Sequence, residues 1–335
     1  MQLSILRSAP ATLAPKVMIG LPVYNGENYL EQALQSILAQ TYTNLQVIVG
    51  DNASSDRTEE IIRSYMAQDD RILYYRHEHN IGAAPNYNFV FQKALERGAT
   101  YFKWAAHDDL MAPSFVESCV EVLERNPSLA IAHSRALSME ADGEISGNFD
   151  YEIRLDGKTA ADRFMRIMWT PGYFTEIFGV MRVDLMRQTR LQGSFAGSDR
   201  SFMAEMLLLG SVGYVERYLF TRRDHPQAYC HMKNKTAQLL WYDTSRPKLM
   251  AYLAGPLKVW YALESIVRTS LNGWDKVQCI EMLMEWGMRR TWETLTGTQG
   301  HYGQQLCQKF SAPTLPTQEM PEPMRPVNAI AMQEA

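Results

Sequence analysis

Apolar and polar residues alternate along this chain with two different periodicities. From Lys16 onward, short apolar runs are separated by longer segments in which apolar residues recur every three to four positions. The first of these longer segments follows the i, i+3, i+4, i+7, i+8 spacing of an amphipathic helix with Leu30, Ala33, Leu34, Ile37 and Leu38. Short strands that alternate with such helices predict βα units and a largely parallel sheet.

The first third of the chain is expected to contain four strands. They are "KVMIGLPVY" (16–24), "LQVIVGDNASSD" with its polar exit loop (45–56), "RILYYR" (71–76) and "TYFKWAA" (100–106). The intervening helices are expected at 25–40, from about Asp56, and from Pro85 to Arg97, where Gly98 ends the helix. The spacing of "DRTE" predicts a capping box between Asp56 and Glu59.

The second half of the sequence predicts a mixed sheet followed by a helical region. A helix after Pro113 is followed by a strand (129–139), which an Asp-Gly turn joins to a weaker partner strand. The expected elements beyond it are a helix (158–168), a loop (169–174), a strand (176–182), a helix (198–210), a strand (212–223) and helices within 234–294. The segment 301–335 is rich in Pro and poor in large apolar residues, which predicts disorder.

The composition of the chain limits which partners it can bind and indicates the cellular compartment in which it works. With 46% hydrophobic residues and a net charge of -4, the chain can fill a large core and gives no electrostatic reason to expect a nucleic-acid partner. Its four cysteines lack CxxC spacing and are expected to remain thiols: Cys119, Cys230, Cys279 and Cys307. The most apolar window (249–267) is interrupted by Pro256, Lys258 and Glu264, so we expect a cytoplasmic protein without a membrane span.

Polar side chains recur where the first, second and fourth expected strands end. They are Asn25, Glu27, Asp51, Asn52, Asp108 and Asp109. Each one alone is equally typical of a turn, a cap or a solvated loop, but ligands bind at this edge of an open α/β sheet. A carboxylate at Asp51 can accept the imide hydrogen of a uracil-like base, and a carboxylate pair can hold a divalent cation against a diphosphate. The pattern therefore favours a nucleotide-sugar site.

Three segments carry a resemblance to a known family. They are "VMIGLPVYNGENYLEQALQSILAQTYTNLQVIVGDNASSDRT" (17–58), "NIGAAPNYN" (80–88) and "WAAHDDLMAP" (104–113). The chain resembles the donor-binding half of a family 2 glycosyltransferase over 16–113, and more weakly to about Pro226. The resemblance implies a GT-A fold, a three-layer α/β/α arrangement around a mostly parallel mixed sheet. It also implies inverting transfer of a sugar from a nucleoside diphosphate sugar, UDP or dTDP, to an acceptor hydroxyl, with Mg²⁺ or Mn²⁺.

The resemblance also divides the chain and assigns a nucleoside pocket. It implies an N-terminal tail (1–15), a transferase domain (16–230, with a donor half 16–110 and an acceptor half 111–230), a helical region (231–300) and a tail (301–335). The residues that match the nucleoside pocket are Pro22, Tyr24 and Glu27, with Asp51 on the base and Asn52 beside it.

The metal and diphosphate positions depart from the family pattern. Asp108 and Asp109 match the later acidic positions of its DxD-type motif, but Ala106 stands where a leading Asp is usual. The metal contact is therefore expected from Asp108 or Asp109. His107 either contacts the sugar or phosphate or is a polar residue at a strand end. In "TRRDHPQAYCH", Arg223 and His225 match a basic segment that helps to hold the donor diphosphate, although a solvated strand end would have the same composition.

The resemblance places the catalytic base at Asp199. This residue matches the family's catalytic carboxylate, which is usually part of an "ED" pair, whereas Ser198 replaces the Glu here. A general base removes the acceptor proton during inversion. The alternative is that Ser198 or Asp199 only caps a helix.

The aromatic C-terminal region has three interpretations. Its Trp and Tyr residues are typical of a core, of a homodimer interface, or of a helix that contacts a lipid-linked acceptor at the inner face of a membrane. The acceptor is accordingly expected to be a glycan or a lipid-linked glycan. Two rival functions stay open: a non-catalytic module of the same fold, suggested by Ala106 and Ser198, and a nucleotidyltransferase, disfavoured because the first loop has only Gly26 and no nearby Lys or Arg.

Overall fold

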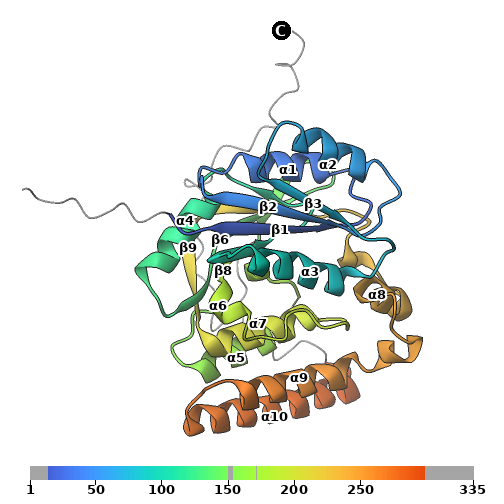
Figure 1. Ribbon diagram of the computed structural model, residues 1–335. Helices are drawn as coiled ribbons and strands as arrows, with labels where there is room; N and C mark the ends of the chain where they lie inside the picture. Colours follow the sequence, from blue (N-terminus) through green and yellow to red (C-terminus); the bar gives the residue numbers. More distant parts are fainter. Residues whose placement is uncertain (1–13, 150–153, 171, 299–335) are drawn as a thin grey trace, which may run out of the picture.

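The computed structural model describes residues 14–149, 154–170 and 172–298 (Figure 1). Nearly all of the expected N-terminal tail and the Pro-rich segment from residue 301 lie outside the described residues. Over the described part, the strands are β1 Val17–Val23, β2 Leu45–Asp51, β3 Ile72–Arg76, β4 Tyr101–Trp104, β5 Leu110–Met111, β6 Leu129–Met139, β7 Ile145–Phe149, β8 Val180–Arg182 and β9 Ser211–Arg223. The expected strands 129–139 and 212–223 are confirmed within one residue at each end.

These strands form one mixed sheet. Its order is β3-β2-β1-β4-β8-β6-β9-β5, and β7 pairs with β6 outside this path. The first four strands run parallel to one another, as the βα pattern predicted. β8 is antiparallel to both β4 and β6, whereas β9 is parallel to β6 and antiparallel to β5. The sheet is therefore mixed in its second half, as expected.

Helices cover both faces of this sheet (Figure 1). They are α1 Leu30–Leu38, α2 Thr58–Met66, α3 Ala83–Glu96, α4 Phe115–Arg125, α5 Ala160–Trp169, α6 Val183–Met186, α7 Ser198–Leu209, α8 Lys235–Tyr242, α9 Ala254–Arg268 and α10 Gly273–Thr296. Alternate residues of β1 enter two separate cores: Ile19 packs with α1, α2 and α4, and Met18 packs with α3, α5 and α7. The result is the expected three-layer α/β/α arrangement.

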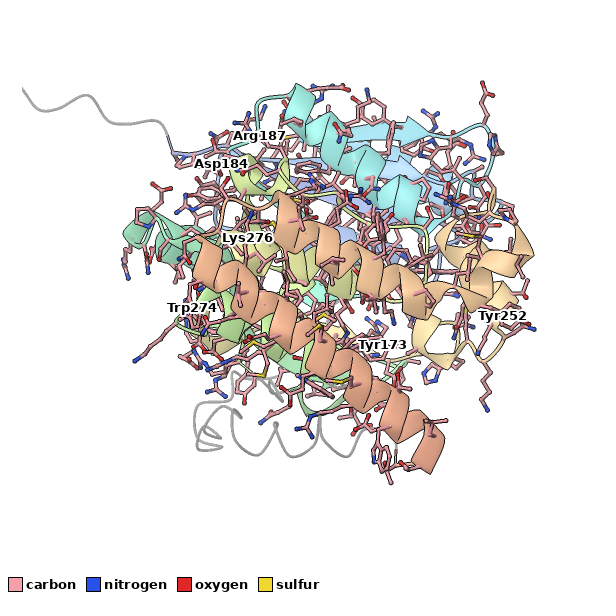
Figure 2. The ribbon with its side chains drawn as sticks, turned by 90° about the horizontal axis from the view of Figure 1, so that it is seen from below. Tyr173, Asp184, Arg187, Tyr252, Trp274 and Lys276 are labelled. Carbon is pink, nitrogen blue, oxygen red and sulfur yellow. The ribbon has the colours of Figure 1, made fainter. Side chains whose placement is uncertain are left out.

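The C-terminal helices add a further layer beneath α5 and α7. Figure 2 shows α9 and α10 side by side across this face, with Trp274 and Lys276 labelled near the start of α10. Trp286 is buried, and its Nε1 donates to the carbonyl of Met168 at 2.9 Å. Trp260, Trp274 and Trp292 are instead exposed by 60–68%. The aromatic region thus supplies core residues and an exposed surface. Among the described helices, none combines the length and the hydropathy needed to cross a bilayer.

Two local expectations are wrong. The predicted capping box does not form, because the Asp56 carboxylate accepts from the amides of Glu27 and Thr58, both at 3.0 Å, and Glu59 pairs with Arg63 at 2.7 Å. The expected strand 176–182 is a strand only at β8, and Glu176–Phe178 is a 3₁₀ turn, η1. This turn ends at Gly179, where an added Cβ would lie 2.6 Å from the carbonyl oxygen of Ala132 in β6.

The η1 turn buries a carboxyl group in the core. Glu176 is 1% exposed, and its Oε1 accepts from the hydroxyl of Tyr214 at 2.9 Å. Its Oε2 has no hydrogen-bond partner among the described residues. Burial raises the pKa of Glu176 to about 7, although the Tyr214 hydrogen bond acts in the opposite direction. The folded protein therefore keeps a proton on this group at pH values where the unfolded chain has released it.

Glu176→Gln is expected to stabilise the protein at alkaline but not at acidic pH. The wild type loses stability as pH rises from the unfolded pKa of 4.5 to about 7, because only the unfolded chain releases the proton over that window. Gln has no proton to release, so urea unfolding at about pH 8 should show a gain of about 1–3 kcal/mol, which shrinks toward pH 5. Glu281→Gln, at an exposed residue of α10, is the matched control. An equal gain at both pH values would contradict the assignment.

Candidate functional site

A cavity of about 750 Å³ lies at the carboxyl ends of β1, β2 and β4. Its walls come from the loops after these strands, from the start of α7, from the segment after β9 and from α8. Six of the lining residues represent these parts: Tyr24, Asn52, Asp108, Asp199, His225 and Trp241. Residues far apart in the sequence thus surround one space at the sheet edge where the strand pattern predicted a ligand.

The acidic pair after β4 is bound to the end of β9. His225 Nε2 lies 2.9 Å from Asp108 Oδ2. The backbone N–H of Arg223 donates to Asp109 Oδ1 at 2.9 Å, and Arg223 Nε donates to the backbone carbonyl of Asp108 at 3.0 Å. Four of the residues predicted for the metal, sugar or diphosphate therefore form one connected group, and the fifth, His107, also lines the cavity.

The two carboxyl groups of this pair have different proton affinities. Burial and the negative charge of Asp108 raise the pKa of Asp109 to about 8. Burial acts on the pKa of Asp108 as well, but the hydrogen bond from His225 and the charge of His107 outweigh it and lower that pKa. The pair thus holds one carboxylate whose ionised form is favoured and one buried acid whose ionisation is disfavoured, although the charges of Arg222 and Lys103 act against that second shift.

Arg223 lines the cavity and also contacts other side chains of the protein. It is 3% exposed, its guanidinium carbon lies 4.6 Å from the ring centre of Tyr29, and it donates to Gln32 Oε1. Tyr29 also packs against His225, with ring centroids 4.8 Å apart. These contacts fix the position of the charged segment relative to the acidic pair.

The predicted nucleoside residues divide into two groups. Pro22, Tyr24 and Asn52 line the cavity, and Tyr24 is 46% exposed. The Asn52 amide donates to Asn80 Oδ1 at 2.9 Å and to the carbonyl of Gly82 at 3.1 Å. Asn52 therefore connects the loop after β2 to the loop before α3 on this wall.

Asp51 and Glu27 lie outside the described lining of the cavity. Asp51 is fully buried, and its Oδ2 accepts from the Tyr74 hydroxyl at 2.7 Å and from the Arg76 guanidinium. Glu27 Oε2 accepts from the amide of Arg57 at 3.1 Å. Both carboxylates thus bind protein donors here, and their contacts with a nucleoside stay predictions.

Asp199 lines the cavity at the second position of α7. Helix capping does not account for it, because the N-cap of α7 is Gly197 and the described chain provides no side-chain cap bond there. Asp199 Oδ1 accepts from the adjacent amide of Arg200 at 2.8 Å, and Ser198 is fully buried with its hydroxyl donating to Gln192 Oε1 at 3.2 Å. Asp199 is thus the carboxylate of this helix start that reaches the cavity.

An aromatic wall was not predicted at residue level. It consists of Tyr173, Tyr229, Trp241 and Tyr242. The Tyr229 and Trp241 ring centroids lie 4.6 Å apart, and the Tyr242 hydroxyl accepts from the amide of Gly197 at 3.2 Å. The sequence signals were the loop that contains Tyr173 and the aromatic content of the helical region that contains Trp241 and Tyr242, and neither shows which residues turn toward the sheet.

A glycine permits the close approach of α8 to the sheet edge. Gly82 has φ +91°, and a Cβ there would lie 2.5 Å from the Cα of Asp243, which follows α8. A larger residue at this position would therefore push away the helix that carries Trp241 and Tyr242.

Known proteins share parts of this sequence and its fold. The model of glycosyl transferase family 2 matches residues 18–187. An uncharacterized glycosyltransferase of Rickettsia typhi is 41% identical over 115 residues, which cover 34% of each chain. Glycosyltransferase GlyA of Streptococcus pneumoniae is 30% identical over 185 residues, which cover 51% of this chain and 26% of GlyA. The chain spans about a third or less of the length of several curated relatives that it matches.

The fold likeness extends beyond the family match. The crystal structure of S. aureus TarS 1–349 in complex with UDP superposes with a TM-score of 0.61 at 14% identity, covering 85% of this chain and 74% of that one. The corresponding complex with UDP-GlcNAc gives a TM-score of 0.60 at 15% identity, with the same coverage. The expected GT-A fold is thereby confirmed.

Proposed function

Because this chain belongs to glycosyl transferase family 2, we propose that it transfers a sugar from a nucleoside diphosphate sugar to an acceptor hydroxyl with inversion. One observation carries the proposal: Asp108, Asp109 and His225 form a connected group in the wall of the cavity that Asp199 also lines. Such a cavity offers acidic groups for the donor and a separate carboxylate for the acceptor.

The acidic pair suits a divalent cation. Asp109 is a buried carboxyl group next to the Asp108 carboxylate, and carboxylate oxygens are the ligands that Mg²⁺ and Mn²⁺ prefer. We assign Asp108 and Asp109 to this cation. When bound, it would neutralise charge on the departing diphosphate. His225 holds Asp108 in place, and the charge of Arg223 lies beside the same pair.

The proposed base is Asp199. It lies in the first turn of α7 and lines the cavity, where a bound acceptor can reach it. From there it accepts the proton of the acceptor hydroxyl as the oxygen attacks the anomeric carbon of the donor. A single displacement of this kind inverts the configuration at that carbon.

The cavity wall also suggests where the two substrates lie. We place the nucleoside against Pro22, Tyr24 and Asn52, with UDP as the first candidate because TarS shares the fold and binds UDP. A contact between Asp51 and the base would require its bond to Tyr74 or Arg76 to open. The aromatic wall offers faces on which the apolar side of an acceptor pyranose can stack, which supports a glycan or lipid-linked glycan as acceptor.

A thermal-shift screen tests the donor assignment. UDP and dTDP with Mn²⁺ are expected to raise the melting temperature more than GDP does, because they are the nucleotides of the proposed donors. A ligand at 100 times its Kd stabilises the folded protein by about 2.7 kcal/mol. Omitting Mn²⁺ should reduce the shift. A chain that responds to none of the three nucleotides and hydrolyses none of their sugar conjugates would support the non-catalytic module instead.

A further inference from the structure

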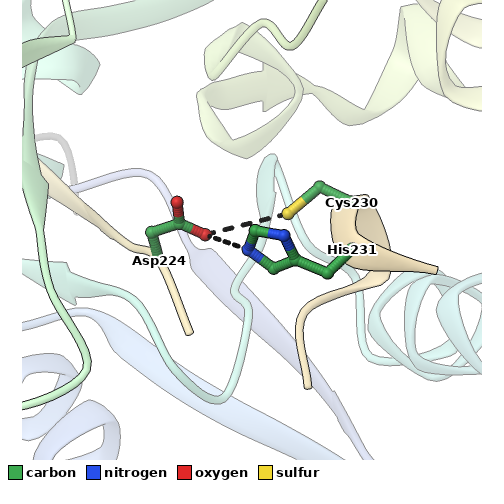
Figure 3. Close-up of side chains that lie close together, drawn as sticks. All are labelled: Asp224, Cys230 and His231. Atoms are coloured by element: carbon green, nitrogen blue, oxygen red, sulfur yellow. Dashed lines mark hydrogen bonds and ion pairs between the residues drawn. The ribbon is translucent and has the colours of Figure 1, made fainter. Parts of the chain in front are cut away.

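A second cluster of potential metal ligands lies beside the cavity. Asp224 follows β9, and Cys230 and His231 belong to the 3₁₀ turn η2 (Tyr229–His231). Figure 3 shows their side chains pointing toward one another. His231 Nε2 lies 2.8 Å from Asp224 Oδ1, Cys230 Sγ lies 3.8 Å from the same oxygen, and all three donor atoms lie within 4.8 Å of one another. The proposed transfer uses none of these side chains.

We propose that Asp224, Cys230 and His231 bind Zn²⁺ or a transition-metal ion of similar softness. With metal–ligand bonds of about 2.0–2.3 Å, adjacent donor atoms of a tetrahedral zinc site lie about 3.3–3.5 Å apart. The two distances to Asp224 Oδ1, 2.8 and 3.8 Å, lie on either side of this value. The Cys230 and His231 donor atoms also lie within 4.8 Å of each other, so rotation of the side chains can bring all three to an ion.

The donor atoms determine which ion fits. A thiolate and an imidazole favour zinc, cobalt and related ions, whereas carboxylate oxygens favour magnesium and manganese. The acidic pair at Asp108 and Asp109 has the second kind of chemistry. The two sites are therefore expected to select different metals, which makes them separable by experiment.

Charge and exposure are compatible with a bound dication. A Cys230 thiolate and the Asp224 carboxylate together balance two positive charges. Arg222 lies with a guanidinium nitrogen 3.6 Å from Cys230 Sγ, where it donates an outer hydrogen bond to the sulfur. The side chains of Asp224 and His231 are 37% and 50% exposed, so an ion can enter from solvent. Three protein ligands leave a fourth position for water.

Such an ion would restrain the segment that carries His225. Asp224 directly precedes His225, whose ring is bonded to Asp108. Bridging Asp224 to η2 closes the chain between them into a metal-bound loop, which fixes the backbone on both sides of His225. The proposed ion therefore has a structural role next to the cavity and does not depend on the sugar-transfer assignment.

Cobalt absorption of the full chain tests this site directly. Titration with Co²⁺ is expected to produce a near-ultraviolet band from sulfur-to-cobalt charge transfer, which added Zn²⁺ removes. Cys230→Ser should abolish the band, and His231→Ala should weaken Co²⁺ binding at least about 10-fold, since even outer partners of a ligand contribute 10–100-fold.

Matched variants separate this site from its neighbours. Cys307→Ser should keep the band, and so should Asp108→Asn, because the acidic pair contributes no sulfur. Cys119 and Cys279 are fully buried and inaccessible to the added ion. Should Cys230→Ser fail to fold, His231→Ala, at a half-exposed side chain, tests the site independently. Absence of the band in the wild type, its persistence in Cys230→Ser, or Co²⁺ binding unaffected by His231→Ala would overturn the proposal.

Discussion

Replacing Asp199 by Asn is expected to lower sugar transfer by a factor on the order of 10² or more, because the amide cannot accept the proton of the acceptor hydroxyl. Asn preserves the size of the side chain and can still accept the amide hydrogen of Arg200. Nucleotide binding should therefore remain nearly unchanged. The measurement is kcat for transfer together with the thermal shift induced by the nucleotide.

The matched control for this variant is Asp184→Asn. Asp184 is an exposed carboxylate of α6, labelled in Figure 2, and it lies outside the described lining of the cavity. This variant should transfer sugar at the wild-type rate. Unchanged turnover in Asp199→Asn would remove Asp199 from the mechanism, and a parallel loss of nucleotide binding would assign it to the donor instead.

The second large effect is expected at the acidic pair. Asp108→Asn removes the charge that His225 faces at 2.9 Å, and Asp109→Asn removes the buried acid beside it. Either change should lower metal-dependent turnover by a factor on the order of 10² or more, since the diphosphate leaves with less of its charge neutralised. Activity measured across a Mn²⁺ titration distinguishes weaker metal binding from slower chemistry.

A conservative substitution elsewhere controls for the loss of a carboxylate. Asp70 is exposed in the turn before β3, and Asp70→Asn should retain the wild-type Mn²⁺ dependence. Full metal-dependent activity in both Asp108→Asn and Asp109→Asn would show that the pair does not hold the cation.

The elements that hydrophobic periodicity specifies could be predicted well. β6 coincides with the expected strand, and α7 begins at the expected residue, Ser198. The periodic pattern also separated the two faces of α1, where Leu30, Ala33, Leu34 and Ile37 are buried. Such patterns depend on residues that are near one another in the sequence, and they report which face of a helix or strand is buried.

The geometry of the cavity depends on contacts that no local pattern encodes. Asp108 and His225 are separated by 117 positions and are brought together where β5 pairs with β9. β5 contains only Leu110 and Met111, which is too short for a period to appear. Asp56 is a similar case, because its second carboxylate oxygen accepts from the distant amide of Glu27, a contact that the local spacing does not encode.

The packing of α9 and α10 makes both helices part of the core that lies under α5 and α7. Ile266 of α9 and Cys279 and Trp286 of α10 belong to the same core cluster as Phe164 of α5 and Phe202 of α7. A cut after β9 would open that core to water and also remove the helix that carries Trp241. A chain that ends after β9 is therefore expected to be less stable than the full chain, because apolar side chains of α5 and α7 would face water.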